Sequence, residues 1–140
     1  MATSTFTNAT DYGPSDNISS TVTVTGMTAS TITAIRVEMD WHPDPGGSCG
    51  SDAGDSYGSV TDPDSTYHTI FADAELSGGG VQSAGFDIAS SNFPSNPNGS
   101  WNFLLEDYAG NGCNTQDEVR VIFTYTDAAT GNPAFAMFVD

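Results

Sequence analysis

The sequence predicts an all-β protein built as an antiparallel two-sheet sandwich. Three observations favour this class. Glycine occurs 15 times and serine and threonine recur along the whole chain, a composition typical of strands joined by tight turns. Short segments of alternating polar and apolar residues are separated by glycine and proline. No segment sustains the 3.6-residue period of an amphipathic helix, so we expect less than about a tenth of the chain to be helical.

The alternating segments predict about eight strands in a single domain, which suits a chain of 140 residues. Turn signals such as Gly13–Pro14, Gly26 and Gly131–Asn132–Pro133 separate them. The expected strands are Ser4–Asn8, Ser19–Thr25, Thr31–Trp41, Thr66–Ala72, Ala84–Ile88, Trp101–Glu106, Glu118–Thr126 and Ala134–Val139. Residues 43–65 are poor in large apolar side chains and rich in Gly, Ser and Asp, so we expect a long surface loop there.

Two of these strands alternate clearly enough to predict which side faces the core. In residues 31–41 the core side holds Ile35, Val37 and Met39, and in residues 118–126 it holds Val119, Val121 and Phe123. Among the aromatic residues, five suit core positions of a sandwich: Phe71, Phe86, Trp101, Phe103 and Phe123.

The outward sides of the same two strands carry the two arginines, Arg36 and Arg120. Oppositely charged side chains on neighbouring strands help to set their register. We therefore expect these strands to be neighbours, with Glu38 and Glu118 flanking the arginines on the outer face.

The charge balance is extreme, with no lysine, two arginines and 18 acidic residues for a net charge of −16. Such a surface repels phosphates, so we expect no nucleic acid and no anionic membrane as a direct partner. No run of about 20 apolar residues is present, so no transmembrane helix is expected. The first eight residues lack the basic and apolar parts of a signal peptide.

Two regions resemble the P domain, which is attached to proprotein convertases and many bacterial proteases. Residues 21–26 read TVTVTG and residues 32–42 read ITAIRVEMDWH. Residues 99–107 read GSWNFLLED and lead through an acidic, glycine-rich loop into the strand at 117–126. The resemblance covers residues 19–41 and 99–126, and the family's H-T-x-x-G-D-L continuation is missing. It implies a jelly-roll β-sandwich with a role in binding, stability or assembly rather than in catalysis.

In a jelly roll the strands at 31–41 and 118–126 pair antiparallel, which would bring the loops at 43–64 and 107–116 to one end. Each loop holds one of the two cysteines, Cys49 and Cys113. We expect them to form a disulfide, worth about 4 kcal/mol in the chain-entropy model. Two unpaired thiols or a bridge between subunits are the alternatives. A disulfide would place the mature protein outside a reducing cytosol.

Several aspartates would gather at the same end, and the resemblance implies a calcium site there, because many P domains bind calcium through loop aspartates. The candidate ligands are Asp40, Asp44, Asp107 and Asp117, which would supply the oxygens that calcium prefers. Solvated carboxylates are the competing interpretation, because a chain with 18 acidic residues places aspartate in every loop. We therefore expect no required cofactor, with calcium as the one ion that the clustered aspartates and the resemblance suggest.

Three aromatic residues in or beside the long loop, Trp41, Tyr57 and Tyr67, could form a platform for stacking carbohydrate. The favoured alternative is that Trp41 caps the core and that the tyrosines pack the loop.

The motifs give no support for catalysis, and we expect the protein not to be an enzyme. His42 and His68 are the only histidines, and no H-E-x-x-H or G-x-S-x-G motif is present. His42 is expected to be a strand-end residue that is hydrogen-bonded to a backbone group.

The leading hypothesis is a structural protein of the virion surface, such as a phage capsid decoration or head-fibre module, with the capsid shell or sister subunits as partner. The alternatives are a secreted or cell-surface adhesion or carbohydrate-binding domain, and a P domain that stabilises a subtilisin-like protease; either would be extracellular. Residues 2–9 and 134–139 carry no charged side chain, so we expect them to form the assembly contact and the acidic loops to point away. The contact residues would be Phe6, Phe135, Met137 and Phe138.

Overall fold

The computed structural model describes residues 1–15, 17–43, 56–72, 80–107 and 114–126. The described chain forms nine strands and two single-turn 3-10 helices, at Ala29–Thr31 and Ser90–Asn92. The strands are β1 (Ala2–Asn8), β2 (Tyr12–Ser15), β3 (Asn17–Val24), β4 (Ile32–Pro43), β5 (Ser56–Thr61), β6 (Tyr67–Phe71), β7 (Gln82–Ile88), β8 (Gly99–Asp107) and β9 (Asn114–Tyr125).

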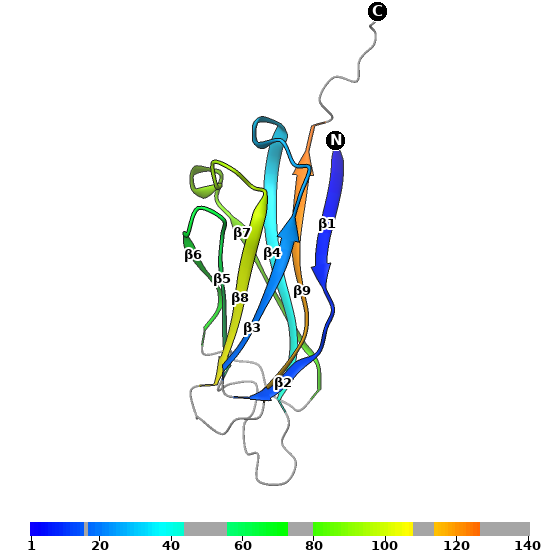
Figure 1. Cartoon of the computed structure of the whole chain (residues 1–140), viewed down its shortest axis with the longest axis vertical. Coiled ribbons are helices and arrows are strands. Elements are labelled where there is room, and N and C mark those ends of the chain that lie inside the picture. The colour runs from blue at the N-terminus through cyan, green and yellow to red at the C-terminus, as the bar shows by residue number, and fades with distance from the viewer. Residues whose placement is uncertain (16, 44–55, 73–79, 108–113, 127–140) are drawn as a thin grey trace, which may run out of the picture.

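The strands form two antiparallel sheets that pack face to face in an elongated sandwich (Figure 1). One sheet has the order β1-β9-β4-β7, with the short β2 also paired to β9, and the other has the order β3-β8-β5-β6. The pairs are nested along the chain, since β1 pairs with β9, β3 with β8, β4 with β7 and β5 with β6. This is the pattern of one long hairpin wrapped around a core, which defines a jelly roll. The predicted fold class is confirmed.

The core lies between the sheets and follows the alternation that the sequence shows. The predicted inward sides of β4 and β9 are buried, with each of their six apolar residues at most 1% exposed. Trp101 of β8 meets Phe123 of β9 edge to face, with ring centroids 5.9 Å apart, so that the two sheets interlock. Phe86 is the exception among the predicted core aromatics, because it lies on the edge strand β7 and is 37% exposed.

The prediction of a long loop at residues 43–65 is wrong in its second half. Residues 56–61 form strand β5 (Ser56–Thr61), which lies between β6 and β8 in the sheet. The pattern concealed this strand because its buried positions are mostly small, with Val60 as the one large apolar residue. The short strand β2 was also not predicted. The strand expected at 134–139 lies outside the described residues.

Gly58 shows why small residues are needed in β5. A Cβ atom at this position would lie 2.3 Å from a ring carbon of Phe71. That ring is stacked on the indole of Trp41, with 4.0 Å between centroids and 9° between planes. The absence of a side chain at position 58 therefore lets the Phe71–Trp41 stack close one end of the core.

We expect Gly58→Ala to lower the free energy of unfolding by about 2 kcal/mol, because the Phe71 ring must leave its stack to admit a methyl group. Urea unfolding followed by tryptophan fluorescence measures the effect. Gly80→Ala is the matched control, because a Cβ there meets nothing within 4 Å. Equal stability of the two variants would contradict this account of the packing.

Candidate functional site

The first candidate site is the outer edge of β1. This strand pairs with β9 on one side, from Ala2 opposite Tyr125 to Asn8 opposite Val119, and no described strand pairs with its other side. Its residues alternate between half-buried and exposed positions, and none of its side chains is charged. Edge strands are usually protected by charges, prolines or bulges. β1 has none of these, so its backbone is open to pairing.

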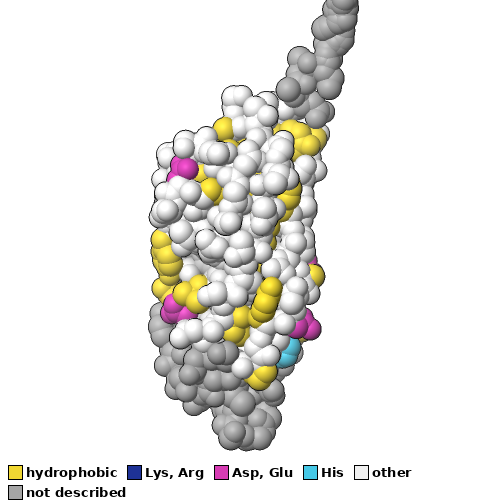
Figure 2. Space-filling model, in the orientation of Figure 1, with side chains coloured by type: hydrophobic (Ala, Val, Ile, Leu, Met, Phe, Trp, Pro, Cys, Tyr) yellow, Lys and Arg dark blue, Asp and Glu magenta, His cyan; other side chains and the backbone are white. Residues whose placement is uncertain are grey.

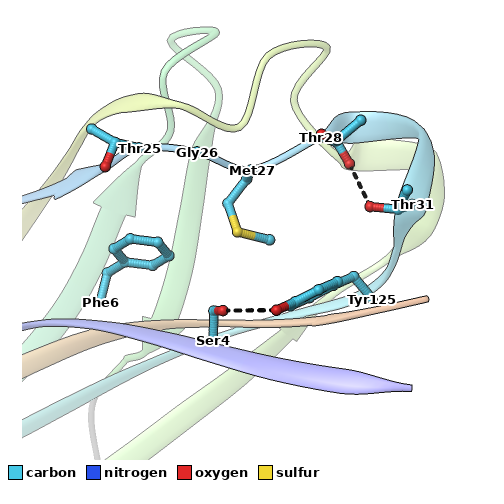
Figure 3. Close-up of a pocket in the computed structure, with 8 residues that line it drawn as sticks. All are labelled: Ser4, Phe6, Thr25, Gly26, Met27, Thr28, Thr31 and Tyr125. Carbon is cyan, nitrogen blue, oxygen red and sulfur yellow. Dashed lines mark hydrogen bonds between the residues drawn. The ribbon is translucent and has the colours of Figure 1, made fainter. Parts of the chain in front are cut away.

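A pocket lies beside this edge, between β1 and the connection from β3 to β4 (Figure 3). Its volume is about 210 Å³, below the roughly 300–1,000 Å³ of typical small-molecule sites, so it suits amino-acid side chains better than a cofactor. Its wall combines three large side chains with several hydroxyl groups and no charged group: Ser4, Phe6, Thr25, Gly26, Met27, Thr28, Thr31 and Tyr125.

Hydrogen bonds fix the shape of this pocket. The hydroxyls of Ser4 and Tyr125 lie 3.2 Å apart and join β1 to the end of β9. Asn98 holds the backbone of Met27 from both sides, accepting from its N–H at 2.9 Å and donating to its carbonyl oxygen at 2.8 Å. Phe6 packs edge to face on Phe123, with centroids 5.9 Å apart. The pocket therefore exists before any partner binds.

Phe6 is the residue of this site that the sequence predicted as an assembly contact, and the structure places it in the pocket wall. Its predicted companions Phe135, Met137 and Phe138 lie outside the described residues. Met27 and Tyr125 were not predicted. The one signal for Met27 is a large apolar residue directly after the turn at Gly26.

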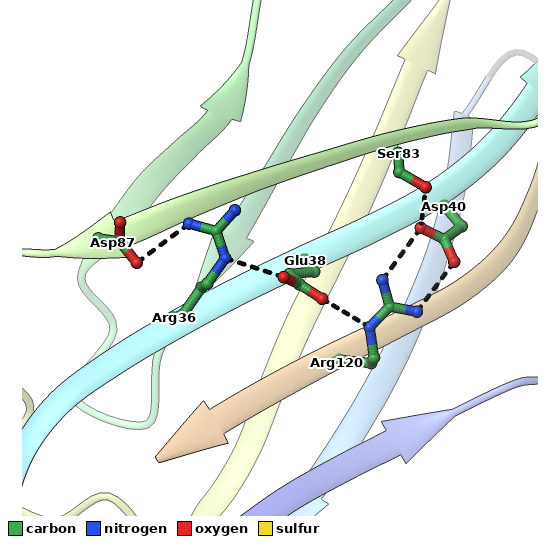
Figure 4. A network of polar contacts seen from close by, with 6 residues as sticks. All are labelled: Arg36, Glu38, Asp40, Ser83, Asp87 and Arg120. Atoms are coloured by element: carbon green, nitrogen blue, oxygen red, sulfur yellow. Dashed lines mark hydrogen bonds and ion pairs between the residues drawn. The ribbon is translucent and has the colours of Figure 1, made fainter. Parts of the chain in front are cut away.

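The second candidate is the charged outer face of the β1-β9-β4-β7 sheet (Figure 4). The strands of Arg36 and Arg120 are neighbours, as predicted, with Glu38 directly opposite Arg120. One carboxylate oxygen of Glu38 accepts from Arg36 Nε and the other from Arg120 Nε, both at 2.8 Å. Arg120 also holds Asp40 through two nitrogens, at 2.9 and 3.0 Å, and Glu118 at 2.7 Å.

This network sets the protonation of its carboxylates. The hydrogen bonds from Arg120 lower the pKa of Asp40 although burial opposes them. Burial would raise the pKa of Glu38, but hydrogen bonds from both arginines outweigh it and lower the pKa. Gly85 makes room for the arrangement, because a Cβ there would lie 2.3 Å from Arg36 Nη2. Both arginines thus form ion pairs with carboxylates of the same sheet.

The outer face of the other sheet differs, because it is almost uncharged. Its exposed residues on β3 and β8 are Asn17, Ser19, Thr21, Thr23, Ser100 and Asn102. The described part of the surface in Figure 2 is mostly white, for uncharged polar side chains and backbone, with scattered hydrophobic and acidic side chains. The sequence pattern predicts an uncharged contact surface at residues 2–9 and 134–139 and gives no sign of this second neutral surface.

Two of the four predicted calcium ligands have other partners in the structure. Asp40 is bound by Arg120 and by the hydroxyl of Ser83. Asp117 lies 2.9 Å from His42 Nδ1, which also corrects the expected backbone partner of His42. Asp44 lies outside the described residues, and Asp107 ends β8. Within the described ranges no group of three or more His, Cys, Asp and Glu could hold a metal ion. Calcium binding stays a prediction.

The strand ends that flank the two predicted loops do meet. Pro43 is paired with Asn114 and Ser56 with Asp107, and the Asn114 side-chain amide donates to Ser56 Oγ at 3.1 Å. Cys49 and Cys113 themselves lie outside the described residues, so their disulfide stays a prediction.

The structure removes Trp41 from the predicted carbohydrate platform, because its side chain is fully buried under Phe71. The favoured alternative for this residue, a cap on the core, is correct. Tyr67 is 51% exposed, and its hydroxyl lies 2.6 Å from that of Tyr57.

Comparisons with known proteins add little. No family model and no curated protein matches the chain, so membership of the P-domain family stays a prediction. Among similar solved structures is a chain from the infectious bursal disease virus Gx strain, with a TM-score of 0.44 and 15% identity. The match covers 91% of this chain, which spans about a third (33%) of that one. No helix in the described part of the chain is long and apolar enough to cross a membrane.

Proposed function

We propose that this chain is a non-enzymatic structural protein of the virion surface, a capsid decoration or head-fibre type module that acts by binding the capsid shell or its sister subunits. The observation that carries the proposal is the unprotected, uncharged edge of β1 beside a preformed neutral pocket. A sandwich that acted alone would be expected to protect such an edge. Jelly rolls are frequent in capsids, which adds support by fold analogy alone.

The charge distribution supports the same proposal. The net charge of −16 opposes association of copies, and the β1 edge carries no charged side chain. The acidic network lies on the outer face of its sheet, with both arginines engaged there. Association through the β1 edge would therefore bring copies together at an uncharged element, and the acidic network would remain in solvent.

Immunogold electron microscopy of gradient-purified particles from the source culture tests this proposal, with an antibody raised against the recombinant chain. We expect label on the outside of intact particles, and mass spectrometry of the same fraction should find the chain. Recovery of the chain only as part of a secreted protease, or only free in the medium, would contradict the proposal and favour the P-domain or adhesion alternative. A preparation without the primary antibody controls for background.

A further inference from the structure

We propose that the free edge of β1 and its pocket receive residues Ala134–Val139 of a second copy of this chain as an added antiparallel strand. The inference rests on the proposed function, because it specifies how copies would join. A strand added beside β1 would continue the sheet, so alternate side chains would point inward. Phe6 of β1 already points to that side and lines the pocket with Met27 and Tyr125.

The sequence of residues 134–139, AFAMFV, fits this position. It is six residues long, close to the seven of β1, and it contains no charge, proline or glycine. Phe135, Met137 and Val139 fall on one side of an extended chain, where an apolar pocket could receive them. In a chain of net charge −16, pairing of this segment with the uncharged β1 brings together two elements that do not repel.

The direction of the strands favours a second copy over the same chain. β9 ends at Tyr125, paired with Ala2 at the start of β1, and Figure 1 shows both ends at the same end of the sandwich. A segment that turned back from β9 to lie beside β1 would run parallel to β1. Every pair among the described strands is antiparallel, and parallel pairing is slightly weaker. A segment from another copy can approach antiparallel.

The eight residues 126–133 would link the end of β9 to this segment. Fully extended, they span about 27 Å, enough to reach a neighbour that packs edge to edge. We call residues 134–139 the donor segment and the free edge of β1 with its pocket the acceptor. Because these are different surfaces of the chain, the contact is head to tail and would build rings or extended arrays.

Two single variants of the full chain test the proposal. Ser4→Glu places a charge in the pocket wall and blocks the acceptor, and Phe135→Asp blocks the donor. We expect the unmodified chain to associate with rising concentration in sedimentation velocity, and each variant alone to stay monomeric. An equimolar mixture of the two variants should form a one-to-one dimer, because one intact donor then meets one intact acceptor. Hydrogen exchange should slow at β1 in the Ser4-containing partner of that dimer.

Thr69→Glu is the matched control, an added charge at an exposed position on β6, the edge strand of the other sheet, and it should associate like the unmodified chain. Circular dichroism checks that each variant is folded. Association of Phe135→Asp alone would indicate β1-to-β1 pairing and overturn the proposal. If the unmodified chain were monomeric and its β1 were protected from hydrogen exchange, the segment would pair within one chain, and this result would also overturn the proposal. Immunogold labelling of particles tests the proposed function, and sedimentation of the variants tests the added strand. The two experiments are independent, so either proposal can fail while the other holds.

Discussion

Replacement of Arg120 by methionine is expected to lower the free energy of unfolding by about 2 kcal/mol at neutral pH. Arg120 bonds to Glu38, Asp40 and Glu118, and its side chain is 19% exposed. Exposed ion pairs contribute about 0.5 kcal/mol, whereas removal of one partner from a buried pair costs about 3–5 kcal/mol. This half-buried network should lie between the two, because its loss leaves three carboxylates close together without their shared cation.

Lowering the pH should reduce the difference in the free energy of unfolding between the unmodified chain and Arg120→Met. Folding lowers the pKa of both Glu38 and Asp40, so the stability that these groups contribute is present above their unfolded pKa of about 4. It is lost as the pH falls through their folded values. Urea unfolding between pH 7 and pH 2 should therefore show the unmodified chain and Arg120→Met converging in acid. Protonation also relieves the overall charge repulsion of this acidic chain. Because it does so in both proteins, the difference between their free energies of unfolding reports the network alone.

Arg36→Met is the internal control. Arg36 also bonds to Glu38, but its side chain is 41% exposed and its second partner, Asp87, is 77% exposed. Its loss should matter less than that of Arg120. If the two variants lost equal stability, or if the Arg120 difference did not change with pH, the network would not stabilise the sheet as described.

The features that were predictable from sequence depend on regular alternation. β4 and β9 alternate over many residues, so their inward sides and their pairing through Arg36 and Arg120 could be predicted. β5 could not, because a strand that packs through Gly58 against Phe71 carries no apolar pattern of its own. What identifies it is a contact with a residue that lies 13 positions later in the chain.

The sites were harder to predict because their residues come together from distant segments. The pocket joins β1, the turn after β3 and the end of β9, and Asn98 fixes Met27 from 71 residues away. The acidic residues show the same limit. Composition places aspartates at one end of the sandwich, but it does not reveal that Asp40 is bound by Arg120 and that Asp117 is bound by His42.

His68 and Asp62 form a buried pair between β6 and the turn before it. Asp62→Ala is expected to lower the free energy of unfolding by about 3 kcal/mol. The Asp62 side chain is fully buried, and its Oδ2 lies 2.9 Å from His68 Nε2. Its Oδ1 accepts from the backbone N–H of Asp64 at 2.9 Å and of Thr66 at 3.0 Å. One carboxylate thus accepts from two N–H groups of the turn that joins β5 to β6 and pairs with the imidazole of His68 in β6.

Alanine would leave the buried imidazole of His68 without its acceptor, and a buried group left unpaired costs about 1–3 kcal/mol. The N–H groups of Asp64 and Thr66, which belong to exposed residues, would lose their acceptor as well. Asp62→Asn should cost about 1 kcal/mol, because its side-chain oxygen can still accept from the turn while the shape is retained. Urea unfolding measures both, and hydrogen exchange at the Thr66 amide should accelerate in Asp62→Ala well before global unfolding. If asparagine were as damaging as alanine, the interaction with His68 rather than the turn would dominate. If neither variant were destabilised, the carboxylate would not organise the β5–β6 turn.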